Sequence, residues 1–146
     1  MQQHINEIKT LVSCPPKIYS QLYLSTLSQF VIHCPADLLK QRLKLAIAVL
    51  KLRQGILLPK NAGAEAIAAE EAQWTYALLS GCLLQKLGIE FIERVVPTIA
   101  QCWLQKNNLL FAQWQDIILD KPNDKNELEY VIKKAIDKLA LSPTKE

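Results

Sequence analysis

The chain has 146 residues, of which half are hydrophobic, 21% are charged and only four are glycine. That length suits one domain with a buried core, and the composition excludes a disordered or collagen-like chain. The net charge of +3 does not by itself indicate a nucleic-acid-binding protein, because such proteins usually carry a more concentrated basic surface.

We expect neither a targeting signal nor a metal-binding motif in this sequence. Residues 1–7 lack the basic start and apolar core of a signal peptide, and no uncharged apolar run approaches the ~20 residues of a membrane span. We therefore expect a cytoplasmic protein with no membrane partner. The four cysteines form no Cys-x-x-Cys pair, and the histidines His4 and His33 follow no regular ligand spacing. Reduced, buried thiols are the simpler interpretation, and we expect no cofactor.

Hydrophobic periodicity predicts three helices in the first half of the chain. Residues 5–12 form the first, which the prolines at 15 and 16 stop, and the second runs from there to about His33. The third, residues 38–54, follows Pro35 and is apolar in nearly every direction, so we expect it at the centre of the fold.

The sequence pattern also predicts helices in the second half of the chain. We expect a long helix over residues 64–87 capped by Gly88, and a further helix over 89–105 that Pro97 kinks or restarts. The remaining predicted segments are a loop at 57–63, an unassigned apolar stretch at 109–119, a loop at 121–124, an amphipathic helix at 128–141 and a frayed tail at 142–146. Together, these predicted helices and loops indicate one all-α domain over residues 1–141.

Several stretches share their order and spacing with a known family. They are residues 8–16 (Ile-Lys-Thr-Leu-Val-Ser-Cys-Pro-Pro), 19–30, 38–39, 45–46, 57–59, 74–77 (Trp-Thr-Tyr-Ala) and 83–84. In these residues the chain resembles the N-terminal HD-like domain of TraI/MobH-type relaxases of integrating conjugative elements, a domain often labelled a helicase. The resemblance covers roughly residues 5 to 90. It implies a compact bundle of six or seven helices, with HD-like topology around the second to fifth.

The residues that hold metal in HD domains are replaced in this chain. The family's metal-binding His-Asp pair corresponds to Gln85-Lys86, and its Gly-Leu-Leu-x-His motif reads Asp-Leu-Leu-Lys-Gln, which puts Gln41 in the place of histidine. A histidine-rich segment is shortened to residues 32–37. An amide is a poor transition-metal ligand and a lysine adds positive charge to a cation site. We therefore predict a vestigial site without metal or catalytic residues.

The pair Gln41 and Gln85 yields a geometric prediction. Gln41 shares a helical stripe with Leu45, Ala48 and Leu52, so it stands as a polar residue on an apolar face. Across the former site, its side chain should come within hydrogen-bonding reach of Gln85 or share a water with it. The simpler interpretation of Gln41 alone is a satisfied polar residue at the edge of the core.

Two further groups of residues could have a functional role. Lys40, Lys44 and Lys51 share a polar arc, with Lys60 beyond, and could contact phosphates, although such arcs are more often solvated faces. Trp74 and Tyr76 fall on different sides of their helix, so one of them could be exposed and mark a partner surface.

His33 and Cys34 are adjacent, as a base and a nucleophile would be. Neighbouring helical residues point about 100° apart, which favours an ordinary histidine and a buried cysteine.

The predicted function is non-enzymatic: a degenerate HD-like domain that acts as a protein-interaction or assembly module in a mobile-element or conjugation context. A protein partner or self-association is therefore expected. The alternative is a nucleic-acid-binding accessory domain that uses the lysine arc, with weak, salt-dependent binding. A metal-dependent phosphohydrolase with a relocated site is the least favoured hypothesis.

Overall fold

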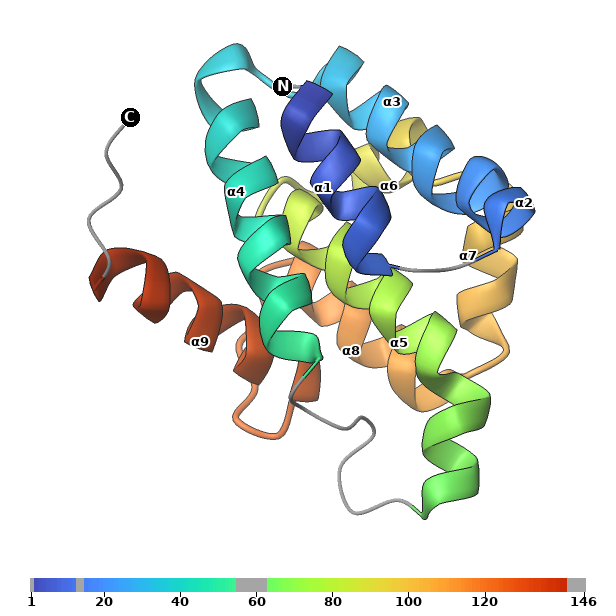
Figure 1. Ribbon diagram of the computed structural model, residues 1–146. Coiled ribbons are helices and arrows are strands. Elements are labelled where there is room, and N and C mark those ends of the chain that lie inside the picture. The colour runs from blue at the N-terminus through green and yellow to red at the C-terminus, as the bar shows by residue number, and fades with distance from the viewer. Residues whose placement is uncertain (1, 13–14, 55–62, 142–146) are drawn as a thin grey trace.

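The computed structural model describes residues 2–12, 15–54 and 63–141, which form helices and connecting turns and no strand. The elements in chain order are α1 (Gln2–Val12), α2 (Pro16–Ile18), the π-helical segment η1 (Tyr19–Leu24), α3 (Ser25–His33), α4 (Ala36–Arg53), α5 (Ala64–Leu84), α6 (Ile89–Val95), α7 (Thr98–Gln105), α8 (Asn108–Ile118) and α9 (Glu127–Leu141) (Figure 1). The predicted all-α class is confirmed.

The number of helices is larger than predicted. Because α2, η1 and α3 form one continuous helix, the described residues contain eight helices rather than six or seven. Two features account for the difference: Pro97 separates α6 from α7, and the unassigned stretch at 109–119 forms α8. Asn107 explains the second, because its side chain accepts a hydrogen bond from the backbone N–H of Leu110 at 3.3 Å and caps the helix.

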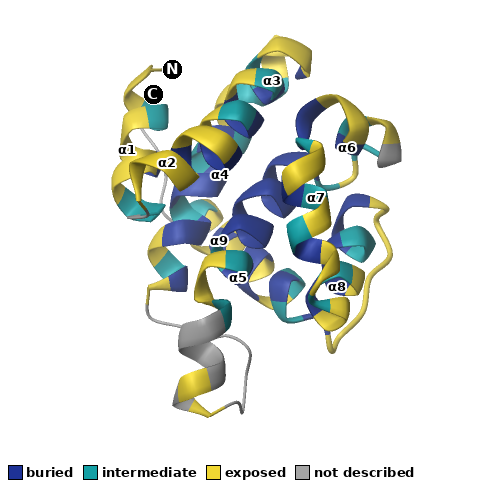
Figure 2. Cartoon of the chain, turned by 90° about the vertical axis from the view of Figure 1, so that its right-hand side faces the viewer, coloured by how far each residue is buried: buried dark blue, intermediate teal, exposed yellow. Residues whose placement is uncertain are grey.

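Helix α5 lies in the core and packs against α4, α7, α8 and α9. Every residue from Tyr76 to Leu84 is buried, which is visible as the dark helix at the centre of Figure 2. Helix α4 also contacts α1 and α9, so the predicted central place of residues 38–54 agrees with the packing. No helix in the described ranges has the length and apolar character needed to cross a membrane.

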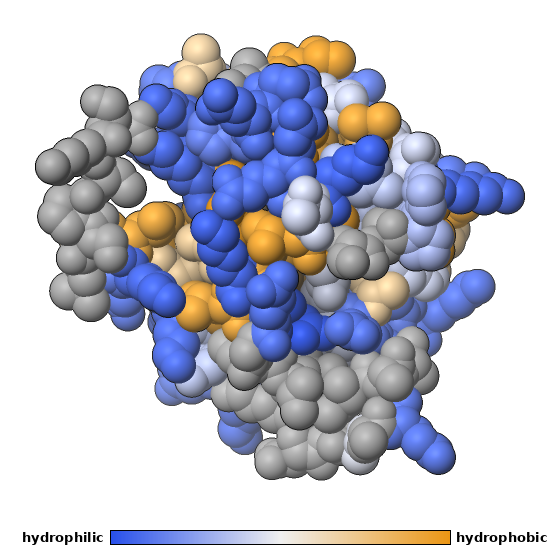
Figure 3. All heavy atoms as spheres, in the orientation of Figure 1, coloured by the Kyte–Doolittle hydropathy of each residue, from blue (hydrophilic) through white to orange (hydrophobic). Residues whose placement is uncertain are grey.

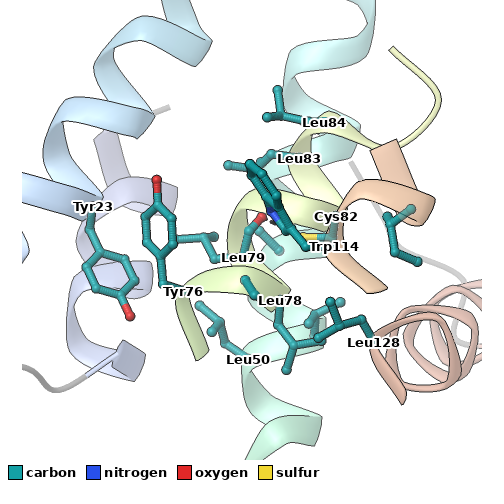
Figure 4. Close-up of a cluster of buried hydrophobic side chains, with 14 of the residues drawn as sticks. Tyr23, Leu50, Tyr76, Leu78, Leu79, Cys82, Leu83, Leu84, Trp114 and Leu128 are labelled. Atoms are coloured by element: carbon teal, nitrogen blue, oxygen red, sulfur yellow. Dashed lines mark hydrogen bonds between the residues drawn. The ribbon is translucent and has the colours of Figure 1, made fainter. Parts of the chain in front are cut away.

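Buried hydrogen bonds tie α5 to its neighbours. The Tyr76 hydroxyl lies 2.6 Å from Thr26 Oγ1 on α3, and the Thr26 hydroxyl donates to the Leu22 carbonyl at 2.7 Å. On α8, the indole Nε1 of Trp114 donates to Ser80 Oγ at 2.9 Å. Figure 4 shows Tyr76 and Trp114 among the apolar side chains of this core. These bonds fix the rotation of α5, because buried polar groups are costly when they lack partners.

The predicted end of the long helix needs correction. Helix α5 ends at Leu84 rather than at 87, and Gly88 directly precedes α6 instead of closing α5. The left-handed conformation that ends the helix falls on Lys86, whose φ is 63°. Gly88 also has a positive φ, 95°, so the glycine serves the turn into α6. Residues 57–62 of the predicted loop at 57–63, and the predicted tail at 142–146, lie outside the described residues, and Gly63 directly precedes α5.

Candidate functional site at the end of α5

The end of α5 carries Gln85 and Lys86, two of the positions where the family resemblance places metal ligands. Gln85 follows the helix and is half-buried, and Lys86 is exposed. The first turns of α4 lie beside them, because the side chain of Arg42 reaches the carbonyl groups at this helix end.

Arg42 is the central side chain of this site. Its Nη1 donates to the carbonyl oxygens of Gln85 at 2.8 Å and of Cys82 at 3.2 Å, and lies 3.5 Å from that of Leu83. The last carbonyls of a helix have no partner within the helix and carry the negative end of its dipole. A guanidinium with several N–H donors therefore caps α5 both by hydrogen bonding and by charge.

Two buried thiols lie close to this cap. Burial raises the pKa of Cys82 to about 12, and the positive charge of Arg42 only partly opposes that rise. Burial also raises the pKa of Cys34, again against the effect of Arg42. Both thiols are therefore protonated at neutral pH, which makes them poor nucleophiles and poor metal ligands.

The structure favours the simpler interpretation of His33 and Cys34. His33 is exposed at the end of α3, whereas Cys34 is buried with its Sγ 3.5 Å from the Pro35 carbonyl oxygen. Of the other cysteines, Cys102 is exposed, which corrects its expected burial, and Cys14 lies outside the described residues.

Gln41 does not occupy the predicted position. Gln41 is exposed, and the described hydrogen bonds include none between the Gln41 and Gln85 side chains. The half-buried Arg42 stands instead in line with the buried Ala46 and Val49, which follow it at helical spacing. The predicted hydrogen bond between the Gln41 and Gln85 side chains is therefore absent, and the neighbouring Arg42 reaches Gln85 instead. The missed signal is Arg42, a cation on a stripe whose next members are alanine and valine.

Trp74 and Tyr76 do not form a partner surface. Both side chains are 0% exposed. Their separation around the helix predicts exposure of one of them, but neighbouring helices cover both positions, so both rings enter the core. Tyr76 packs edge-on against Tyr23, with ring centroids 5.3 Å apart.

The lysine arc of α4 is partly covered by α1. Lys51 Nζ forms an ion pair with Glu7 Oε2 at 3.1 Å, and Lys44 is half-buried while Lys40 is exposed. Hydrophilic side chains dominate much of this side of the molecule, with apolar patches between them (Figure 3). Because α1 adds a carboxylate to the arc, the three lysines do not form a purely basic surface, and Lys60 lies outside the described residues.

The described side chains include no group of three or more His, Cys, Asp and Glu residues arranged to hold a metal ion. The chain matched no family model, no curated protein and no solved structure. The resemblance to relaxase HD-like domains therefore stays a prediction from the sequence.

Proposed function

We propose that this chain is a non-enzymatic, degenerate HD-like domain that acts as an interaction or assembly module. The observation that carries the proposal is the Arg42 guanidinium hydrogen-bonded to the end of α5. The HD-like topology and the conjugation context belong to the same proposal and rest on the sequence resemblance alone.

The chemistry of the cap supports a non-catalytic role. A hydrolytic metal site needs imidazole or carboxylate ligands that hold a cation and lower the pKa of its bound water. Here the adjoining groups are a guanidinium, the Gln85 amide and the Lys86 ammonium, and two of these three are positively charged. Such groups stabilise a helix end, and they disfavour a second cation by charge repulsion.

Elemental analysis of the purified protein tests this part of the proposal. Protein prepared in zinc- and manganese-supplemented medium without chelator should carry no stoichiometric transition metal. Its melting temperature should also be unchanged by EDTA, since no described side chains supply a ligand set. One tightly bound transition metal per chain would contradict the proposal.

Exposed apolar side chains support the interaction role. Ile32 on α3, Ile99 on α7 and Leu109 on α8 are 69%, 57% and 57% exposed, although each is a large aliphatic residue. Single exposed apolar residues are common, but a side chain of this kind gains free energy when a protein surface covers it. We therefore infer that these residues contribute to contacts between copies of the chain.

Replacing Ile99 or Leu109 by aspartate should reduce self-association without affecting the fold. Both side chains are already largely exposed, so the charge lowers the affinity between copies rather than the stability of one copy. Light scattering across a range of protein concentrations measures the effect, with Gln105→Asp on exposed α7 surface as the matched control. A monomeric wild type at every concentration would contradict self-association.

A further inference from the structure

The continuous helix formed by α2, η1 and α3 has an outer face without charged residues. Residues 18–32 contain no Asp, Glu, Lys or Arg, although many of them are exposed, as the yellow positions along α2 and α3 in Figure 2 show. A helix at the surface of a protein normally turns charged residues toward water. The neighbouring α6 does so, with Glu90, Glu93 and Arg94 exposed. The uncharged face of α2–α3 is therefore unusual for a surface in contact with solvent alone.

Large apolar side chains are exposed on this face. Leu24 and Ile32 are 42% and 69% exposed, and Ile18 is 36% exposed. Residues three or four positions apart lie on the same side of a helix, and such rows make the contact when two helices pack. The exposed residues with this spacing are Lys17, Gln21, Leu24, Ser28 and Ile32. Apart from Lys17 at its start, this row is apolar or neutral.

The charge distribution along this row suits a second copy of the same chain. In a two-fold dimer a surface patch meets itself, so a charged residue near the axis would lie against its own like charge. The ends of the row are also complementary when the two helices run antiparallel. Lys17 then lies near the C-terminal end of α3 in the other copy, where the helix dipole is negative and Asp37 is exposed in the first turn of α4.

We propose that two copies of the chain pack these helices antiparallel about a two-fold axis, through the face formed by Gln21, Leu24, Ser28 and Ile32. Leu24, in the middle of the row, lies beside Leu24 of the other copy, and Gln21 lies opposite Ser28. The inference rests on the self-association proposed above and specifies the surface that mediates it, with Ile32 common to both. A single pair of helices makes a small interface, so we expect a dissociation constant in the micromolar range.

Opposite charges introduced at Leu24 test this geometry. Leu24→Lys and Leu24→Glu should each weaken self-association by about tenfold or more, because each places two like charges beside the axis. An equimolar mixture of the two variants should associate again as a heterodimer, because the axis then brings opposite charges together. Sedimentation velocity across micromolar concentrations measures the association of each variant and of the mixture. Since Leu24 is largely exposed, both variants should keep the circular dichroism of the wild type.

Ile136→Lys is the matched control, because Ile136 is 43% exposed and lies on α9, outside the proposed face. This control should leave the dissociation constant unchanged. If the wild type dimerises and Leu24→Lys dimerises equally well, or if the mixture of Leu24→Lys and Leu24→Glu stays monomeric, the α2–α3 face is not the two-fold surface. Either result would overturn this inference and leave the proposed self-association intact, whereas a wild type that is monomeric at every concentration would overturn both.

Discussion

Arg42→Ala should lower the free energy of unfolding by about 2–3 kcal/mol, because charge-assisted hydrogen bonds to partly buried carbonyls are among the stronger ones. The Arg42 guanidinium donates hydrogen bonds to the carbonyl groups of Cys82 and Gln85 at the end of α5. Alanine would leave these acceptors in a crowded site and would also remove the cation from the negative end of the helix dipole. Urea denaturation followed by circular dichroism measures the loss.

Two companion variants separate the cap from general effects of substitution in α4. Arg42→Lys should recover only part of the stability, since the lysine side chain is one atom shorter than the path to the Arg42 Nη1 that makes these bonds. Gln41→Ala is the matched control, because Gln41 is the exposed neighbour in the same turn, and its effect should stay within about 0.5 kcal/mol. An Arg42→Ala variant as stable as Gln41→Ala would show that the hydrogen bonds at the end of α5 contribute nothing.

The helices themselves could be predicted because their boundaries have local causes. Prolines precede α2, α4 and α7, and the apolar spacing within each helix is clear from the sequence. The stretch at 109–119 was ambiguous because its periodic run is short. Asn107, which caps α8, is a residue type that occurs both in turns and at helix starts, so it indicates a possible helix beginning at this point.

The candidate site was harder to predict because it depends on which side of a nearly all-apolar helix faces the core. Around α4, a stripe through Gln41 and a stripe through Arg42 are both apolar at most positions, so the pattern does not distinguish them. Contact with α5 decides in favour of Arg42. Likewise, the angle between Trp74 and Tyr76 indicated one exposed ring, whereas the surrounding helices bury both. Contacts between helices that are distant in sequence determine which side of each helix is buried.

Alkaline solution should destabilise the protein by about 4 kcal/mol between pH 9 and pH 11, since each raised pKa contributes about 1.4 kcal/mol per pH unit. The unfolded Cys82 thiol ionises above its ordinary pKa of 9.0, whereas the folded thiol, with its pKa raised to about 12, stays protonated. Burial likewise raises the pKa of Tyr76 above its ordinary value of 10.0. The unfolded state therefore loses protons first, so stability is complete below pH 9 and falls as the pH rises from 9 toward the folded pKa values.

Urea denaturation at pH 8, 9, 10 and 11 measures this decline, and a cysteine pair assigns its source. Cys82→Ala should remove the larger part of the slope that begins at pH 9, and Cys102→Ser, at an exposed position, is the matched control for the loss of a thiol. A wild-type stability that is level from pH 8 to pH 11 would mean that Cys82 ionises within the folded protein. Because the Arg42 charge lowers the Cys82 pKa, Arg42→Ala should raise that pKa further and extend the decline to higher pH. The same guanidinium that caps α5 thus limits the alkaline sensitivity of the thiol beneath it.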